Sequence, residues 1–293
     1  MTTLLARPLG DIEVSAIGMG AMTLTQVAGY DAKRGIRAVH AAVDAGITFF
    51  DTADSYGQSG TYGENELALV RALRLYGGAL DRVVIATKGG HTRHENGSWW
   101  IDGSPTHLAS AARHSLRRLG LESLPLYQLH RPDPRRDFAE SLMALRLLHE
   151  QGLVQRVGIS NVSVDQLARA REILGPALVS VQNELSSTAP DDGGVLSASA
   201  ELGLAFLAWG PLGGMRSAKS LGSHEQSAFA QVAADRRVSP QRIALAWLLA
   251  RAPHIIPIPG ASRPQSIRDS AGAVEIELTA DELRRLGESE PIQ

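Results

Sequence analysis

The most constraining feature of the chain is a regular alternation of short apolar runs with amphipathic segments, which continues from residue 17 to near the C-terminus. Apolar runs of strand length occupy residues 17–20, 47–51, 83–87, 124–129, 154–159, 178–182, 205–209 and 255–258. These runs are near-continuously apolar, which is typical of strands that are covered on both faces. Apolar residues at helical spacing follow most of the runs, as at Ile36, Val39 and Val43.

Eight strand-helix units is the number that closes a parallel barrel. An open doubly wound sheet is the competing arrangement, but it typically carries a Gly-x-Gly-x-x-Gly turn after its first strand. The nearest candidate, residues 18–23, lacks the third glycine and the start of a helix. We therefore predict an α/β fold, a (β/α)8 TIM barrel, in one domain that spans residues 1–293.

Additions to the barrel are predicted at both ends of the chain. A β-hairpin that turns at residues 9–11 precedes the first strand. Extra C-terminal helices are predicted at 225–236, before the barrel helix at 240–251, and at 279–288, where a capping pattern opens the last helix. Residues 89–105 are predicted to form a long polar loop.

The composition excludes several classes of function. The net charge is −2, from 29 Lys and Arg against 31 Asp and Glu, so the chain lacks the basic footprint of a nucleic-acid or anionic-membrane partner. The absence of cysteine excludes disulfides, thiolate catalysis and Cys-ligated zinc. The N-terminus lacks the apolar core of a signal peptide, and no run is long enough to span a membrane. We expect a cytoplasmic protein.

Polar side chains gather where the predicted strands end. Parallel barrel strands present their carboxyl ends on one face, where such barrels place their active sites. In chain order the strand-end residues are Asp51, Lys88 (just past its strand), His130, Ser160, Asn161, Gln182, Trp209 and Gly260. Each has an ordinary structural explanation, such as a surface charge for Lys88 or a strand-end amide for Gln182. Their convergence on one mouth favours a functional site.

Four of the residues at this mouth can act together to donate a proton to a carbonyl group. Tyr56 follows Asp51 by five residues and has a reference pKa of about 10. The ammonium of Lys88 favours the phenolate, so we expect it to lower the pKa of Tyr56. Asp51 would keep Lys88 charged. His130 would donate to or orient the carbonyl oxygen.

A redox reaction at this site needs a cofactor, because no side chain supplies a hydride. Ser160, Asn161 and Gln182 are hydroxyl and amide groups that suit a carboxamide. Trp209 offers a flat face on which a ring can stack.

Seven segments together resemble the aldo-keto reductase superfamily across nearly the whole chain, in that family's order and spacing. They are GITFFDTADSYG, VIATKGG, YQLHRPD, VQRVGISN, VSVQNE, LAWGPLGG and IPIPGASRP. The resemblance implies a catalytic tetrad of Asp51, Tyr56, Lys88 and His130. Tyr56 would be the general acid that protonates the carbonyl oxygen as hydride arrives from NADPH. The family default is a monomer that acts on a small-molecule carbonyl substrate.

The same resemblance assigns the cofactor-binding residues. Ser160, Asn161 and Gln182 would hold the nicotinamide carboxamide, and the ring would stack on Trp209. The loop after Trp209 would line the pyrophosphate, and the run after the eighth strand would hold the phosphate of the adenosine end. These two sets are Gly210, Pro211, Leu212 and Gly213, and Gly260, Ala261, Ser262, Arg263 and Arg268.

The chain departs from the family pattern at two places. Ser270 stands where Asn is frequent, which weakens the match on the adenine side. Arg263 and Arg268 are fork-shaped donors suited to a phosphate, so we expect NADPH as the cofactor. Trp209 stands where Tyr is frequent and should still stack.

Other motifs give weaker signals. Trp99 and Trp100 lie in the loop expected to overhang the mouth, so they are interpreted either as substrate contacts or as a loop core. The HTRH segment at 91–94 is interpreted as loop rather than as a metal site. The HRPD segment at 130–133 resembles a kinase catalytic loop only in its letters, because no glycine-rich phosphate loop accompanies it.

Three functions are compatible with these observations. The first is NADPH-dependent reduction of an aldehyde or ketone to an alcohol, with a tyrosine as general acid. The second is a redox-sensing nucleotide-binding subunit with little turnover, against which the intact tetrad argues. The third is a barrel lyase that uses Lys88 as a Schiff base. No motif identifies the physiological substrate. We expect substrate choice to lie in loops 22–30, 89–105 and 211–224 and in the short tail after Ser289, which carry no readable code.

Overall fold

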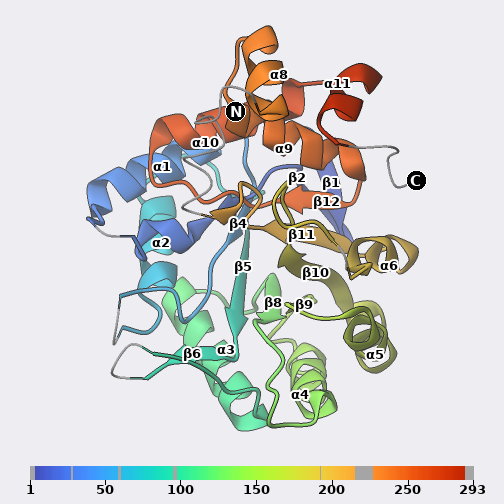
Figure 1. The fold of residues 1–293 in the computed structure, drawn as a ribbon. Helices are drawn as coiled ribbons and strands as arrows, with labels where there is room; N and C mark the ends of the chain where they lie inside the picture. The colour runs from blue at the N-terminus through green and yellow to red at the C-terminus, as the bar shows by residue number, and fades with distance from the viewer. Residues whose placement is uncertain are drawn as a thin grey trace.

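Parallel strands form the frame of the structure and close into a barrel (Figure 1). The computed structural model describes residues 4–27, 29–58, 61–94, 98–191, 193–214 and 227–287. Within them, eight strands follow one another around the barrel in chain order: β3 (Met19–Gly20), β4 (Phe49–Asp51), β5 (Val84–Gly89), β8 (Leu126–Leu129), β9 (Val157–Ser160), β10 (Leu178–Glu184), β11 (Ala205–Trp209) and β12 (Ile255–Pro257). The ends of the sheet meet at Gly20, whose backbone N–H donates to the Pro259 carbonyl at 3.0 Å. The predicted α/β barrel is confirmed.

Helices cover the outside of the barrel (Figure 1). In chain order they are α1 (Ala32–Asp44), α2 (Glu64–Arg74), α3 (Pro105–Leu119), α4 (Phe138–Glu150), α5 (Val164–Leu174), α6 (Val195–Glu201), α8 (Ala228–Arg236), α9 (Pro240–Arg251), α10 (Pro264–Ala271) and α11 (Ala280–Arg285). Most begin after a residue whose side chain accepts a backbone N–H, such as Asp31 before α1 and Ser104 before α3. No helix within the described ranges is long and apolar enough to cross a membrane.

The predicted N-terminal hairpin is present as the antiparallel strands β1 (Ala6–Leu9) and β2 (Ile12–Ser15). Leu9 belongs to the same buried apolar cluster as Phe49 at the start of β4. Gly10 at the turn approaches the barrel so closely that an added Cβ would lie 2.5 Å from Cγ1 of Val179. The hairpin therefore closes the amino-terminal end of the barrel and leaves the carboxyl end open for a site.

The structure differs from the sequence prediction around residues 88–105. The predicted polar loop contains an antiparallel hairpin, β6 (His91–Arg93) and β7 (Trp99–Ile101). Strand β5 continues to Gly89, so Lys88 lies within the strand and not past its end. The reason is that Lys88 pairs with Asp51 inside the barrel, and an apolar run in the sequence does not reveal a charged residue buried in this way.

The predicted extra helices near the C-terminus are present as α8 and α11. Ser227 caps α8, and residues 225–226 of the predicted helix lie outside the described residues. Helix α11 ends at Arg285, and residue 288 of the prediction also lies outside them.

The seam of the barrel makes Gly20 sensitive to substitution, because an added Cβ would lie 2.7 Å from the backbone oxygen of Ile258. We predict that Gly20→Ala lowers the free energy of unfolding by about 1–3 kcal/mol, as overpacking does elsewhere. Gly35→Ala in α1 is the matched control. Its Cβ would meet nothing closer than 3.6 Å, and alanine stabilises a helix by up to about 1 kcal/mol. Urea denaturation measures the free energy of unfolding of both variants. Equal midpoints for the two would contradict the prediction.

Candidate active site

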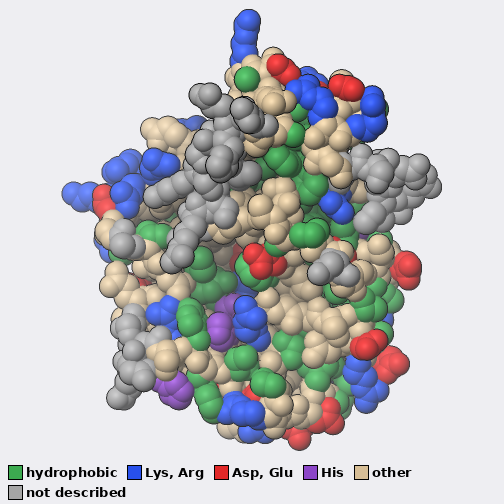
Figure 2. All heavy atoms as spheres, in the orientation of Figure 1, with side chains coloured by type: hydrophobic (Ala, Val, Ile, Leu, Met, Phe, Trp, Pro, Cys, Tyr) green, Lys and Arg blue, Asp and Glu red, His purple; other side chains and the backbone are tan. Residues whose placement is uncertain are grey.

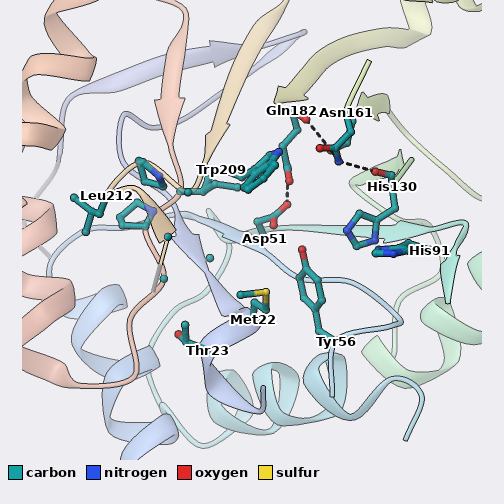
Figure 3. Close-up of a pocket in the computed structure, with 18 of the residues that line it drawn as sticks. Met22, Thr23, Asp51, Tyr56, His91, His130, Asn161, Gln182, Trp209 and Leu212 are labelled. Carbon is teal, nitrogen blue, oxygen red and sulfur yellow. Dashed lines mark hydrogen bonds between the residues drawn. The ribbon is translucent and has the colours of Figure 1, made fainter. Parts of the chain in front are cut away.

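A cavity of about 380 Å³ opens at the carboxyl ends of the barrel strands (Figure 3). Its volume is within the range of small-molecule sites. The sequence-predicted residues that line it are Asp51, Tyr56, Trp99, His130, Ser160, Asn161, Gln182, Trp209, Gly210, Pro211, Leu212 and Gly260. The fold thus brings most of the predicted site into one cavity, from strands that are far apart in the sequence.

Lys88 lies beneath the cavity and is fully buried. Its Nζ donates to Oδ2 of Asp51 at 2.5 Å, to the carbonyl of Thr52 at 3.0 Å and to Oη of Tyr56 at 3.2 Å. These acceptors use all three N–H groups of the ammonium. Lys88 therefore influences the cavity through Asp51 and Tyr56 and does not line it.

Asp51 is held through both of its carboxylate oxygens. While Oδ2 accepts from Lys88, Oδ1 accepts from Nε2 of Gln182 at 2.9 Å and from Nε2 of Gln128 at 3.1 Å. Nε2 of Gln182 also donates to Oε1 of Gln128 at 3.2 Å. Charge-assisted bonds of this kind compensate for the burial of a carboxylate, so the two amides fix Asp51 opposite Lys88.

The two titratable partners of this network have shifted pKa values. Burial by itself lowers the pKa of Lys88, but the charges of Asp51 and Tyr56 and the hydrogen bonds to them outweigh it, and the pKa is raised. Burial raises the pKa of Tyr56 and outweighs the opposing effect of Lys88. The expectation that Lys88 brings the pKa of Tyr56 below its ordinary value is therefore wrong for this structure. Tyr56 is a protonated phenol at neutral pH.

His130 faces Tyr56 edge-on, with ring centroids 5.5 Å apart. Its Nδ1 is buried and has no hydrogen-bond partner among the described residues. His91 contacts His130 at a centroid distance of 4.9 Å and stacks on Trp99 at 4.3 Å. Burial, together with nearby positive charges, lowers the pKa of His130 well below its usual value and that of His91 to about 4. Both imidazoles are neutral at pH 7.

Ser160 and Asn161 both line the cavity, and Asn161 lies between His130 and Gln182 (Figure 3). Nδ2 of Asn161 donates to the His130 carbonyl at 3.0 Å and to Oγ of Ser160 at 2.9 Å. Oγ of Ser160 donates in turn to the Gln182 carbonyl at 2.7 Å. Asn161 has a φ of 60°, which few residues other than glycine adopt. Both N–H groups of its amide are used, so Oδ1 is the atom that it can offer to a ligand.

A glycine-rich turn follows Trp209 at the end of β11. Gly210, Gly213 and Gly214 have φ values of 61°, 76° and 80°. Gly213 does not line the cavity, but its N–H donates to the Gly210 carbonyl at 2.8 Å and shapes the turn. Turns of this kind present backbone N–H groups that can bind an anion.

Several sequence-predicted residues do not line the cavity: Lys88, Trp100, Gly213, Ala261, Ser262, Arg263 and Arg268. Arg263 and Arg268 are exposed, before and within α10. Trp100 packs against the Arg135 guanidinium, 3.6 Å from the ring centroid. It follows Trp99 in β7, and neighbouring residues of a strand point to opposite faces.

Sequence reasoning gave no individual role to several residues that line the cavity: Gly20, Met22, Thr23, His91, Arg131, Gly214, Ile258 and Pro259. Met22, Thr23, His91 and Gly214 do fall in the loops from which substrate choice is expected, whereas residues 215–224 and the tail after Ser289 lie outside the described residues. It also missed Gln128, which holds Asp51 from below. Two of these had a signal, because Gln128 and Arg131 lie in the same YQLHRPD segment as His130. Met22 and Thr23 lie in the short helix η1 (Ala21–Leu24), at the start of the segment expected to be a loop, and no sequence pattern marks them individually. Within the described residues, no group of three or more His, Asp or Glu could hold a metal ion.

Comparisons with known proteins match this chain to one family and to relatives named as an oxidoreductase and a dehydrogenase. The model of the aldo/keto reductase family matches residues 16–290. An uncharacterized oxidoreductase of Schizosaccharomyces pombe is 33% identical, over 96% of this chain and 88% of its own. Pyridoxine 4-dehydrogenase of Escherichia coli is 34% identical, over 95% of this chain and 96% of its own.

Solved structures of enzymes share this fold over nearly the whole chain. A glycerol dehydrogenase from Gluconobacter oxydans superposes with a TM-score of 0.81 and 26% identity, covering 96% of this chain and 92% of its own. An aldo/keto reductase from Klebsiella pneumoniae, solved with NADP and acetate, gives a TM-score of 0.79 and 25% identity, covering 97% and 94%.

Gln128 supplies one of the two amide donors to Oδ1 of Asp51. We predict that Gln128→Leu lowers the free energy of unfolding by about 1–3 kcal/mol, because it removes a bond to a buried charged group. Ser180→Ala is the matched control inside the barrel, since Oγ of Ser180 is buried without a partner among the described residues. Urea denaturation should show a lower midpoint for the Gln128 variant only. Equal midpoints would mean that Gln182 alone suffices.

Two histidines buried as neutral rings make stability depend on pH. An unfolded chain binds a proton at each near pH 6.5, whereas the folded pKa of His91 is about 4 and that of His130 is well below 6.5. The unfolded state therefore binds more protons as the pH falls from about 6.5 toward 4, and the free energy of unfolding falls with it. We predict that His91→Gln shows a smaller decrease in Tm between pH 7 and pH 5 than the parent protein. His114→Gln, at an exposed position on α3, is the control, and an unchanged pH slope in His91→Gln would contradict this.

Proposed function

The chain belongs to the aldo/keto reductase family, and on that premise we propose that it reduces the carbonyl group of an aldehyde or ketone with Tyr56 as the general acid. It is an NADP-dependent oxidoreductase. The observation that carries the role of Tyr56 is its position: it lines the cavity, and its Oη accepts from the buried ammonium of Lys88 at 3.2 Å.

The described residues fit NADPH, which supplies a hydride when it is bound. Trp209 presents its ring to the cavity, and Oδ1 of Asn161 is the free atom of an otherwise committed amide. Gly210 and Gly214 line the cavity with positive φ, so the turn there is open to a pyrophosphate. Arg263 and Arg268 are exposed near the start of α10, where a phosphate also benefits from the helix N-terminus.

An asparagine at position 270 could bind the adenine end of the cofactor, but Ser270 is not free to do so. Its Oγ donates to the Ser266 carbonyl at 3.0 Å within α10. Asp269 is likewise engaged, by Arg242 at 3.1 Å. We therefore assign recognition of the adenosine phosphate to Arg263 and Arg268.

Tyr56 transfers its proton to the carbonyl oxygen as that oxygen gains negative charge. Burial keeps Tyr56 protonated beforehand, because it raises the pKa of the phenol. The phenolate that results is stabilised by the N–H of Lys88, whose own raised pKa keeps it a cation. His130 is neutral and adjacent to Tyr56, so it can hold the substrate oxygen without competing as an acid.

The environment of Lys88 argues against the Schiff-base alternative. A lysine nucleophile must lose its proton and reach the substrate, but Nζ of Lys88 is buried and donates to three acceptors. The alternative of a redox-sensing subunit with little turnover differs from our proposal in a measurable way, since it requires nucleotide binding without substrate reduction.

Tyr56→Phe tests the proposal directly. We predict that kcat for aldehyde reduction falls by at least about a hundredfold, because a general acid contributes roughly 10²–10⁴-fold. NADPH binding, followed by quenching of tryptophan fluorescence, should persist. Tyr76→Phe is the matched control, since it removes the same hydroxyl from a site outside the cavity where, among the described residues, it bonds only to Asp44. Turnover that survives in Tyr56→Phe would contradict the assignment, and nucleotide binding without turnover in the parent protein would favour the sensor.

A further inference from the structure

We propose that the cavity selects carbonyl substrates that carry a second, anionic group, a carboxylate or a phosphate, and that Arg131 binds this group. The inference rests on the proposed function and names its substrate class. It starts from the one cavity-lining cation in the described part of the chain.

Arg131 follows His130, just after strand β8 ends at the cavity, and its side chain is half-buried. Within the described residues it has neither an ion-pair partner nor a side-chain hydrogen bond. Arg135 and Arg136, in the same loop, both pair with Asp133, at 3.0 and 3.9 Å. The loop thus satisfies its other two arginines internally and leaves the third facing the cavity.

The cavity offers Arg131 no counter-charge from the described residues. Asp51 is the only acid among those that line it, and Asp51 is already engaged by Lys88, Gln128 and Gln182. His91 and His130 are neutral at pH 7. A half-buried guanidinium without a partner binds a carboxylate or phosphate through paired N–H groups, and more strongly where water is partly excluded.

The position of Arg131 suits a substrate better than the cofactor. His130 and His91 lie on one side of Tyr56, and Trp209 and Leu212 lie on the other (Figure 3). Arg131 directly follows His130 and so belongs to the histidine side. Trp209 and Leu212, which we assign to the nicotinamide ring and the pyrophosphate, lie on the opposite side of Tyr56. On the surface view, histidine and basic side chains lie next to one another on the same face of the molecule (Figure 2).

An aromatic wall gives this side of the cavity a fixed shape. Trp99 stacks on His91 at 4.3 Å, and the guanidinium of Arg93 covers its ring at 3.9 Å. The wall supplies apolar surface beside the cation. A substrate whose body rests on the wall can direct its carbonyl to Tyr56 and its anionic group to Arg131.

The test compares matched substrates that differ only in charge. Benzaldehyde is paired with 4-carboxybenzaldehyde, and glyceraldehyde with glyceraldehyde 3-phosphate, so the two arms separate carboxylate from phosphate. NADPH consumption gives kcat/KM for each, in the parent protein and in Arg131→Met, Arg131→Lys and Arg131→Glu. Arg117→Met removes an exposed arginine of α3 and serves as the control. Thermal melts and NADPH titrations confirm that each variant is folded and binds the cofactor.

We expect the parent protein and Arg117→Met to prefer the anionic member of at least one pair. Arg131→Met should reduce that preference by about tenfold to a hundredfold, as the loss of a charged hydrogen bond does. Arg131→Lys should keep part of it, and Arg131→Glu should reverse it. A high-salt assay should weaken the preference in the parent protein.

Three results would overturn the inference while leaving the proposed function intact. They are equal kcat/KM for charged and neutral members of both pairs, a preference that Arg131→Met does not change, and a loss of NADPH affinity in Arg131→Met that accounts for the whole effect. If no carbonyl compound is reduced at all, the proposed function itself fails.

Discussion

The buried ion pair between Lys88 and Asp51 is the interaction on which the rest of the site depends. Removing two such charges from water costs several kcal/mol for each ion, and a pair of this kind is tolerated only when further hydrogen bonds satisfy both groups. Here Thr52, Gln128 and Gln182 supply them. Thr52 directly follows β4, and Gln128 and Gln182 lie in β8 and β10, so the bonds that satisfy the pair need these strands to be in this arrangement. The geometry around Tyr56 is thus a consequence of how the barrel strands are arranged.

In the mechanism that we propose, the ion pair also explains how a tyrosine with a raised pKa can serve as an acid. A carbonyl oxygen that gains negative charge becomes far more basic than a phenolate, so the acid need not be strong. It must be protonated before the reaction and its conjugate base must be stabilised afterwards. Burial does the first for Tyr56, and the N–H of Lys88 at 3.2 Å does the second. Sequence reasoning identified the lysine but gave its effect too much weight, since the depth of burial of a side chain is a property of the fold.

The fold could be predicted from sequence because its signals are local and repeated. Eight apolar runs and their helix caps specify the barrel, and parallel strands place Asp51, His130 and Gln182 at one mouth. What sequence could not supply depends on side-chain direction and on contacts across strands. The strand around Lys88, the hairpin of β6 and β7, and the opposite faces of Trp99 and Trp100 are of this kind. Gln128 was missed because a buried amide has meaning only once its partner, Asp51, is known.

The polar groups on the two sides of the cavity differ in whether they already have hydrogen-bond partners within the protein. At Asn161 and Gln182, which we assign to the nicotinamide carboxamide, the side-chain N–H groups already donate to other protein groups. A ligand there meets a preorganised frame, which suits a cofactor used in every turnover. On the histidine side, Arg131 lacks any such partner within the described chain, so an anion that binds there completes the arrangement. In the arrangement that we propose, substrate recognition is separate from cofactor recognition, because a change at Arg131 would alter substrate choice without disturbing the groups that we assign to the nicotinamide.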